Sequence, residues 1–462
     1  MTDAQPDTQT ISLYVKPPKV YPRETRGRFS RLRVIAAWAL LGLFYVLPWI
    51  NWGGQQLVLF DLPGRQFHFF GITLWPQDLF ILSLLLALAA FTLFFFTALA
   101  GRLWCGYACP QTVWTEVFLW MERVTEGSRN KRIKLDKAAW TKDKILRKSS
   151  KQLLWITFAL WTGFTFVGFF VPIRELGPRV LGFDLGGWET FWMFFYGFAT
   201  YGNAGYMREQ VCKYMCPYAR FQSAMFDADS LVISYDAERG EPRGGRSKSA
   251  DHRAMGLGDC IDCTACVQVC PTGIDIRDGL QIECIACAAC IDVCDEIMDR
   301  MDYPRGLIRY TTENAVNNKP TRVLRPRIFI YLAVLGLLAT VIGVFLTGRD
   351  PLIIDVLRDR SALYRLIDSE LENSYSLKLT NRTDQTMTLS INAEGLPDIR
   401  VLEPTRDVHV AAGQTADLPL TVALPLAAAD PGMQPMTIIV RDADNERSTR
   451  VETRFFIPAN PN

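Results

Sequence analysis

Eight cysteines between positions 260 and 294 form two runs with the same spacing. The segment reads CIDCTACVQVCPTGIDIRDGLQIECIACAACIDVC, and each half follows the pattern C-x2-C-x2-C-x3-C. Thiolates are soft ligands, and in this spacing the first three cysteines of a run bind one iron–sulfur cluster while the fourth reaches across to the other. The two runs therefore predict two 4Fe–4S clusters.

The crossed pattern assigns four cysteines to each cluster. The first set is Cys260, Cys263, Cys266 and Cys294, and the second set is Cys270, Cys284, Cys287 and Cys290. Structural zinc is the alternative, but zinc sites rarely need three closely spaced cysteines and a crossed fourth. Pro271 prevents a helix from continuing after Cys270, whereas Asp295 stands at the matching position after Cys294. This difference leaves the set of ligands intact, but the sequence does not predict the turn after Cys294 as it does the one after Cys270.

The other four cysteines lie in two copies of a Cys-x-x-x-Cys-Pro motif. LWCGYACPQ contains Cys105 and Cys109, and QVCKYMCPYA contains Cys212 and Cys216. Residues four apart on a helix share a face, so we expect each pair to present two sulfurs to one ion. Two such pairs brought together would make an all-thiolate site, which favours Cu(I), zinc or iron–sulfur over hard cations.

A redox-active relay narrows this second site to copper or another iron centre, because zinc has no redox chemistry. Each motif also resembles the end of a ferredoxin run, CVQVCP. The alternative is that these cysteines are small packing residues at a helix end. Met207 and Met215 could add thioether ligands, although methionine near a membrane is more often apolar packing. His68, His252 and His409 all lie outside the predicted spans, which argues against bis-histidine haem, and no GxGxxG fingerprint suggests a nicotinamide or flavin.

Membrane spans are the elements that must position these thiols. Five apolar stretches have the roughly 20 residues that cross a bilayer, and they lie at 34–52, 78–100, 152–172, 188–206 and 327–347. The fourth contains a glutamate and several glycines, and a buried soluble helix is its alternative. FDLPG at 60–64 and FDLGG at 183–187 recur in the two outer connections. Spans one and two are therefore expected to be repeated as spans three and four, with the two motifs as pseudosymmetry mates.

Lysine and arginine orient these spans. They are dense in the N-terminal arm and in 101–151, and scarce in 53–77 and 173–187. The positive-inside rule then places the N-terminus, both motifs and residues 207–326 in the cytoplasm, and the C-terminal region on the far side. The N-terminus MTDAQPDTQT lacks a signal-peptide pattern, and twelve cysteines suit a reducing compartment.

The expected fold class is a multidomain membrane protein with an α-helical transmembrane domain, a ferredoxin-like domain and an all-β sandwich. Runs in which apolar and polar residues alternate, such as YSLKLTNRTDQTMTLSIN, predict the sandwich. Residues 238–250 are rich in glycine and basic residues, which predicts a flexible linker. The expected domains are a cytoplasmic arm at 1–33, a four-span domain at 34–237, a linker at 238–250, a bacterial-type two-cluster ferredoxin at 251–310, a fifth helix at 327–347 and the sandwich at 349–462.

Two ferredoxin runs, preceded by two Cys-x-x-x-Cys-Pro motifs and followed by one span and a cysteine-free tail, resemble the CcoG family, also called FixG or RdxA. The resemblance covers nearly the whole chain, including RDPLIIDVLRDR. It implies a bacterial inner-membrane protein with a periplasmic immunoglobulin-like domain. It also implies reduction of Cu(II) to Cu(I) for assembly of the cbb-type cytochrome c oxidase. Cys105, Cys109, Cys212 and Cys216 would be the catalytic, copper-binding residues.

Two other functions stay open: a NapH-like subunit that oxidises quinol, and an assembly scaffold whose clusters only stabilise the fold. The large β tail is not expected in a plain relay subunit and favours the metal reductase. The expected partners are the membrane, copper ions, an electron donor that the sequence does not identify, and oxidase assembly factors or a copper chaperone. No nucleic-acid partner is expected, and a homodimer is compatible with these expectations.

Overall fold

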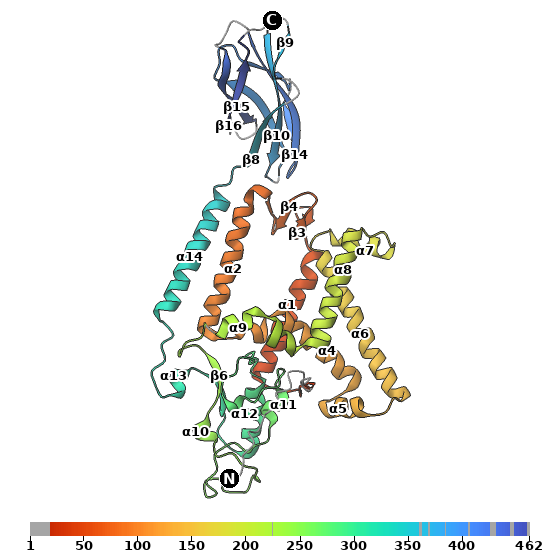
Figure 1. Cartoon of the computed structure of the whole chain (residues 1–462), viewed down its shortest axis with the longest axis vertical. Coiled ribbons are helices and arrows are strands. Elements are labelled where there is room, and N and C mark those ends of the chain that lie inside the picture. Colours follow the sequence, from red (N-terminus) through yellow and green to blue (C-terminus); the bar gives the residue numbers. More distant parts are fainter. Residues whose placement is uncertain are drawn as a thin grey trace, which may run out of the picture. The chain divides into compact units, whose positions relative to one another are not determined.

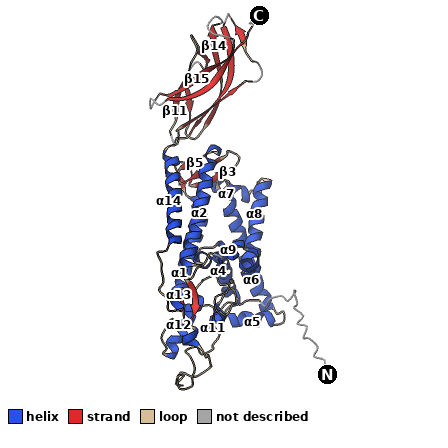
Figure 2. Ribbon diagram, turned by 60° about the vertical axis from the view of Figure 1, so that its left-hand side comes forward, coloured by secondary structure: helices blue, strands red, loops and turns tan. Residues whose placement is uncertain are grey.

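The structure is a computed structural model, and it describes residues 19–223, 225–359, 363–367, 370–383, 385–404, 407–425, 431–443 and 448–459. The chain divides into two compact units. The first lies within Met1–Asn51, Gln56–Phe67 and Asp78–Thr340, and the second within Trp52–Gln55, His68–Gln77 and Val341–Asn462. Helices dominate the first unit and strands dominate the C-terminal part of the second (Figure 2).

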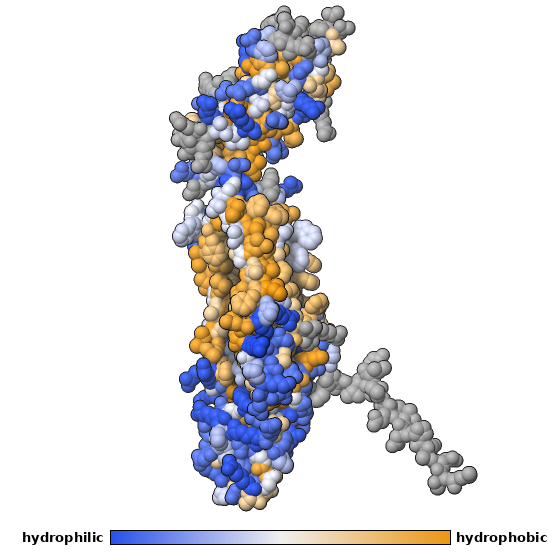
Figure 3. Space-filling model, turned by 90° about the vertical axis from the view of Figure 1, so that its left-hand side faces the viewer, coloured by the Kyte–Doolittle hydropathy of each residue, from blue (hydrophilic) through white to orange (hydrophobic). Residues whose placement is uncertain are grey.

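Within the described residues, three helices are long and apolar enough to cross a membrane. The segments are Arg28–Trp49, which contains α1 (Arg28–Val46), then α2 (Leu79–Ala100) and α14 (Pro326–Thr347). They coincide with the first, second and fifth predicted spans. Their apolar side chains form a band above the hydrophilic surface of the ferredoxin part (Figure 3). Because water would not favour so much exposed apolar surface, these helices support membrane association.

The third and fourth predicted spans are helical, but they do not meet the same test of length and hydropathy. They correspond to α6 (Lys142–Val167) and to α8 (Gly187–Thr200), which continues into the π-helix η3 (Tyr201–Met207). α6 and α8 lie side by side (Figure 1). A Cβ atom added at Gly163 would lie 2.1 Å from the Met193 carbonyl oxygen, so the glycine permits this close approach. A total of five spans stays a prediction.

Shorter helices connect these long ones. They are α3 (Leu103–Tyr107), α4 (Pro110–Glu126), α5 (Arg129–Lys137), α7 (Ile173–Leu181), the π-helix η4 (Val211–Met215) and α9 (Pro217–Ser223). The connection after α1 holds η1 (Leu47–Trp49), β1 (Asn51–Trp52), β2 (Gln55–Gln56), β3 (Val58–Asp61), β4 (Gln66–Phe69), β5 (Ile72–Leu74) and η2 (Pro76–Asp78). The core between α4, α6 and η3 contains Phe118, Trp155 and Ala204.

A buried ion-pair cluster fixes η3 against α4. Glu122 is fully buried, and its carboxylate accepts from Arg132 and Arg208, each at 3.0 Å. Burial by itself would raise the pKa of Glu122, but Arg208 and Arg132 outweigh it and hold the pKa below its ordinary value. Because Arg208 comes four residues before Cys212, this cluster anchors the second Cys-Pro motif to the helix that follows the first.

The ferredoxin part is framed by a two-stranded antiparallel sheet. β6 (Val232–Tyr235) pairs with β7 (Ile308–Thr311), with Val232 opposite Thr311. Between the strands lie α10 (Ala237–Gly240), α11 (Ala265–Val269), η5 (Ile276–Asp278) and α12 (Ala289–Met301), and α13 (Glu313–Val316) follows β7. Ile233, Met298 and Leu307 belong to its core. The domain therefore begins before residue 251, the predicted boundary.

Residues 238–250 differ from the flexible tether that their composition predicts. The Arg239 side chain forms an ion pair with Asp259, and the backbone N–H of Gly244 donates to the Cys260 carbonyl oxygen at 3.2 Å. Arg246 donates to the carbonyl oxygens of Cys260 and Gly258. These contacts hold the segment against the first cysteine run, because its arginines find partners there instead of water.

The C-terminal part is an all-β sandwich, as predicted. One sheet has the order β12-β14-β10-β8, with β9 also paired to β10, and the other has the order β13-β11-β15-β16. The strands are β8 (Leu352–Arg358), β9 (Arg365–Ile367), β10 (Glu370–Asn381), β11 (Met387–Glu394), β12 (Arg400–Glu403), β13 (Val408–Val410), β14 (Thr415–Pro425), β15 (Gly432–Asp442) and β16 (Ser448–Ile457). Leu377, Leu389 and Phe455 are fully buried between the sheets.

Candidate metal-thiolate sites

The eight ferredoxin cysteines line two separate cavities. The first is lined by Cys260, Cys263, Cys266 and Cys294. The second is lined by Cys270, Cys284, Cys287 and Cys290, and Cys266 also borders it. The structure thus groups the cysteines in the two crossed sets that the sequence predicts, and each cavity offers the four sulfur donors that a 4Fe–4S cluster needs. Their role as ligands stays a prediction.

Matching backbone turns produce these two arrangements. Asp262 and Thr264 in the first run have φ angles of 53°, and Ala286 and Ala288 at the equivalent places in the second run have 53° and 59°. Residues other than glycine rarely adopt this left-handed conformation, and it persists where the surrounding structure or a site requires it. In each run this turn leads into a helix. Cys266 lies in α11, and Cys290 and Cys294 lie in α12.

The two cysteine runs differ in exposure at one equivalent position. Cys263 is exposed, whereas Cys287 is buried. Burial raises the pKa of Cys266 to about 11 and the pKa of Cys284 and Cys294 to about 12 each. A buried thiolate needs a compensating positive charge, and metal binding supplies it as the proton leaves. The donor set and its burial therefore fit iron–sulfur clusters, with the first cluster nearer to water.

The four cysteines of the Cys-Pro motifs come together in one place, which we call the four-thiol site. Burial is the main cause that raises the pKa of Cys105 to about 12, and the other three thiols add to this rise. Burial, followed by Cys109 and Cys216, raises the pKa of Cys212 to about 11. Electrostatic effects among the four sulfurs require that both pairs lie near one another. A single metal site built from all four thiols stays a prediction.

The local geometry of each motif corrects the prediction of a shared helix face. Cys105 lies in α3, but Cys109 is extended, with φ −61° and ψ 128°, and α4 begins at Pro110. Cys212 lies in η4, and Cys216 is likewise extended, with φ −80° and ψ 109°. Proline disfavours a helical residue before it, so each helix breaks between its two cysteines.

The two breaks nevertheless have the same hydrogen bonding. The N–H of Cys109 donates to the Trp104 carbonyl oxygen at 2.8 Å, and the N–H of Cys216 donates to the Val211 carbonyl oxygen at 2.8 Å. Each bond spans five residues and closes a wide turn before the proline. Repetition of this turn supports the predicted relation between the motifs. In the part of the chain that the structure describes, no three His, Cys, Asp or Glu side chains are grouped so that they could hold a metal ion.

The four-thiol site lies against the second cluster cavity. Cys105 and Cys212 pack on an apolar group that contains Val269, Ile285 and Cys287. Gly106 makes the approach possible, because a Cβ atom there would lie 2.8 Å from the carbonyl oxygens of both Ile285 and Ala286. This packing places both thiols beside Cys287, a predicted ligand of the second cluster.

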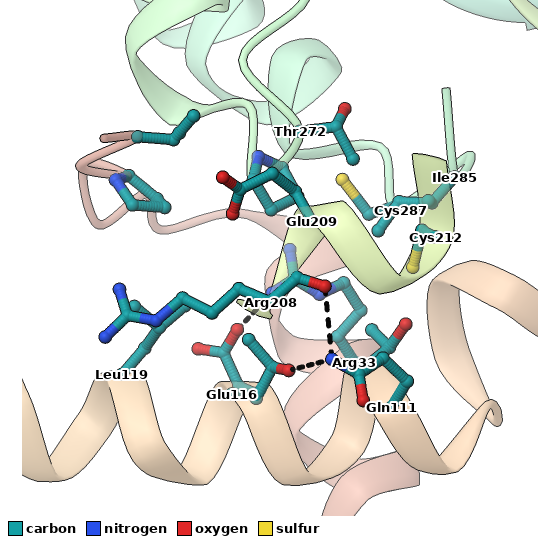
Figure 4. Close-up of a pocket in the computed structure, with 15 residues that line it drawn as sticks. Arg33, Gln111, Glu116, Leu119, Arg208, Glu209, Cys212, Thr272, Ile285 and Cys287 are labelled. Carbon is teal, nitrogen blue, oxygen red and sulfur yellow. Dashed lines mark hydrogen bonds and ion pairs between the residues drawn. The ribbon is translucent and has the colours of Figure 1, made fainter. Parts of the chain in front are cut away.

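A small cavity borders both sites. Cys212 and Cys287 line it, together with Arg33, Glu116, Arg208, Glu209 and other residues of α4 and the 271–287 segment (Figure 4). Arg33 donates to Glu116 at 2.6 Å, whereas burial raises the pKa of Glu209. Met207 and Met215, the predicted thioether candidates, are not among the lining residues, and Met215 is exposed.

Three residues that hold these sites together carry no sequence signal of their own. They are Gly106, Asp292 and Arg102. Asp292 in α12 accepts from the backbone N–H groups of Phe29 and Ser30 at 3.2 and 2.7 Å, and so caps the start of α1. Arg102 donates to carbonyl oxygens of the ferredoxin part. Only the position of Gly106 within the first motif, and that of Arg102 three residues before Cys105, could have drawn attention to them.

Family models match the segments that contain these cysteines. Residues 207–313 match a 4Fe–4S dicluster domain, residues 81–127 match a 4Fe–4S binding domain, and residues 342–458 match a domain described as an IG-like fold at the C-terminus of FixG. The first two matches include the Cys-Pro motifs. A crystal structure of a FixG-related protein from Vibrio parahaemolyticus aligns with 24% of this chain and 98% of its own, at 29% identity and a TM-score of 0.22.

Full-length relatives extend the similarity along the chain. The nitrogen fixation protein FixG of Rhizobium meliloti is 37% identical over 96% of this chain and 94% of its own length. Protein RdxB of Cereibacter sphaeroides is 40% identical over 89% of this chain and 90% of its own, and protein RdxA of the same organism is 39% identical over 89% and 91%. The chain therefore belongs to the FixG family of iron–sulfur proteins, which includes RdxA and RdxB.

Proposed function

We propose that this iron–sulfur protein reduces Cu(II) to Cu(I) at the four-thiol site, with electrons that pass through the two clusters in turn. The observation that carries this proposal is the contact of Cys105 and Cys212 with the apolar group around Cys287. Exposed Cys263 favours the first cluster as the site of electron input, and the second cluster would then pass electrons to the thiols beside Cys287.

Thiolate ligands suit such a reaction. Soft sulfur binds Cu(I) in preference to harder ions, so a sulfur-rich site favours the reduced product. The electron balance is simple: one Cu(II) takes one electron and becomes one Cu(I), and a low-potential one-electron donor restores the electron. Copper here is a substrate.

The cellular role belongs to the same proposal. We place the protein in the bacterial inner membrane, with the cysteines and the ferredoxin part on the cytoplasmic side and the β sandwich in the periplasm. The resemblance described above makes assembly of the cbb-type oxidase the proposed use of the Cu(I), with assembly factors or a copper chaperone as the recipient. The name of the Rhizobium meliloti relative, a nitrogen fixation protein, is compatible with a redox setting.

A second candidate rests on one specific observation. Residues 81–127, which contain Cys105 and Cys109, match a 4Fe–4S binding domain. The four thiols would then hold a further iron–sulfur cluster, and the protein would be a relay. Quinol oxidation would be one use of such a relay, and a scaffold would show no electron transfer at all.

Metal analysis and single-turnover mixing separate these functions. Anaerobically purified protein is reduced with dithionite, freed of the excess and mixed with Cu(II) or with a quinone. We expect about eight irons per chain, because two cubane clusters are present, and oxidation of the clusters by Cu(II) with formation of Cu(I). About twelve irons would favour the further cluster. Oxidation of the clusters by quinone but not by Cu(II) would favour the quinol relay. If neither reagent oxidises the clusters, the scaffold is favoured.

A further inference from the structure

Arg102 is a buried cation near the four-thiol site and the second cluster cavity. It is the N-cap residue of α3, three residues before Cys105, and only 5% of its surface is exposed. Its guanidinium donates to three carbonyl oxygens: to Ile282 by a short contact, to Cys284 at 3.1 Å and to Ala219 at 2.5 Å. Arg102 thereby connects the first Cys-Pro motif with the segment after the second motif and with a residue of the second cluster set.

No carboxylate balances this charge among the residues that the structure describes. Other buried or half-buried arginines differ in this respect. Arg33 pairs with Glu116 at 2.6 Å, Arg208 with Glu122 at 3.0 Å, and Arg325 with Asp227 at 2.9 Å. A buried charge without a counter-ion is costly, and carbonyl dipoles compensate it only in part. The surroundings of Arg102 therefore call for another anionic group.

The cysteine sulfurs of the neighbouring sites would supply such groups. Arg102 donates to the carbonyl oxygen of Cys284, a predicted ligand of the second cluster, and to that of Ala219, three residues after Cys216 of the four-thiol site. These contacts reach the two different sites, so Arg102 lies against both. Arg33 lines the cavity beside Cys287, but it pairs with Glu116.

We infer that Arg102 is the shared counter-ion of the second iron–sulfur cluster and the four-thiol site, and that it sets the reduction potential of that cluster. A cluster gains negative charge when it is reduced, so a nearby cation stabilises the reduced form and raises the potential. The second cluster then accepts electrons from the first more readily. Arg102 is a positioning residue, because it acts through the cysteines and their loop.

The second motif lacks this charge. The residue three positions before Cys212 is Glu209, at the place that corresponds to Arg102. The two motifs therefore differ at this one position, where the first has a positive charge and the second a negative charge. Arg102 contacts the ferredoxin loop, whereas Glu209 lines the cavity of Figure 4.

A redox titration of the full, cluster-loaded protein without copper tests the inference. The variants are Arg102→Gln, which removes the charge, and Arg102→Lys, which keeps it. Arg325→Gln is the matched control, since Arg325 is also buried and donates to a helix-end carbonyl oxygen, that of Ala98 at 2.6 Å. The midpoint potential of each cluster is followed by electron paramagnetic resonance, and iron content is measured in parallel.

The expected result is a more negative potential for one cluster in Arg102→Gln, with the other cluster, the iron content and Arg325→Gln like the parent. Arg102→Lys should retain most of the parent potential. Unchanged potentials in Arg102→Gln, or equal shifts of both clusters, would overturn the inference. If Arg102→Gln loses iron, the Arg102→Lys variant is compared with the parent. A parent-like cluster potential in Arg102→Lys supports the charge effect, and a loss of iron like that of Arg102→Gln contradicts it. Since no copper is present, failure here leaves the proposed Cu(II) reduction untouched.

Discussion

Cys263 and Cys287 occupy equivalent positions in their runs but differ in exposure, the first exposed and the second buried. We predict that Cys263→Ser weakens mainly the first cluster and Cys287→Ser mainly the second, because each run supplies three ligands to its own cluster. Iron analysis and electron paramagnetic resonance of the two variants would show this. Equal loss of both signals from either change would indicate that the ferredoxin part collapses as one unit.

Glu122 allows a prediction about stability at the residue scale. Removing one partner of a buried ion pair leaves the other charge unpaired and costs about 3–5 kcal/mol. Glu122→Gln should therefore lower the thermal midpoint of the detergent-solubilised protein strongly. Asp143→Asn is the control, since Asp143 pairs with Arg147 at the surface, and exposed pairs contribute about 0–1 kcal/mol. Equal effects of the two changes would refute the role given to the buried cluster.

Individual residues were predictable where spacing encodes chemistry. Both crossed cysteine sets follow from the spacing, and the structure groups them accordingly. The conformation of Cys109 and Cys216 was predicted wrongly, because helical periodicity was given more weight than the effect of the following proline. Arg102 was not predicted, since its importance depends on carbonyl groups that are distant in the sequence.

At the scale of elements, α3 and the ferredoxin loop at 285–286 are held together by the absence of a side chain at Gly106. A Cβ atom there would lie 2.8 Å from two carbonyl oxygens, which are backbone atoms and cannot move alone. We predict that Gly106→Ala loosens this contact at a cost of about 1–3 kcal/mol. Hydrogen exchange at residues 284–288 should become faster, while the iron content stays like the parent.

Gly202→Ala is the control for this change, because a Cβ atom at Gly202 would meet nothing within 4 Å. It should leave exchange at residues 284–288 unchanged. Parent-like exchange in Gly106→Ala would show that the ferredoxin loop does not depend on this close contact.

The elements that were predictable are those with strong periodic or apolar signals. Three apolar helices and the β sandwich follow from hydropathy and alternation. The pairing of β6 with β7 and the packing of residues 238–250 depend on contacts that local composition does not encode. Glycine and arginine suggested a tether there, but these arginines have buried or charged partners in the fold.

For the whole molecule, the distribution of lysine and arginine predicts the sidedness. Reporter fusions after residue 130 and after residue 250 should behave as cytoplasmic, and a fusion at residue 400 as periplasmic. A cytoplasmic signal at residue 400 would mean that α6 and α8 do not both act as spans. The shared membrane face of the two Cys-Pro motifs would then need another explanation.

The most direct test of electron transfer to the four-thiol site compares the parent with the double variant Cys105→Ser, Cys109→Ser. Both proteins are loaded with clusters, reduced, and mixed with Cu(II) in a stopped-flow instrument, with cluster absorption and Cu(I) formation recorded together. We expect about eight irons in both proteins. We expect the clusters to be oxidised, and Cu(I) to form, in the parent alone. Equal rates in the two proteins would contradict it, because copper would then meet the clusters without these thiols.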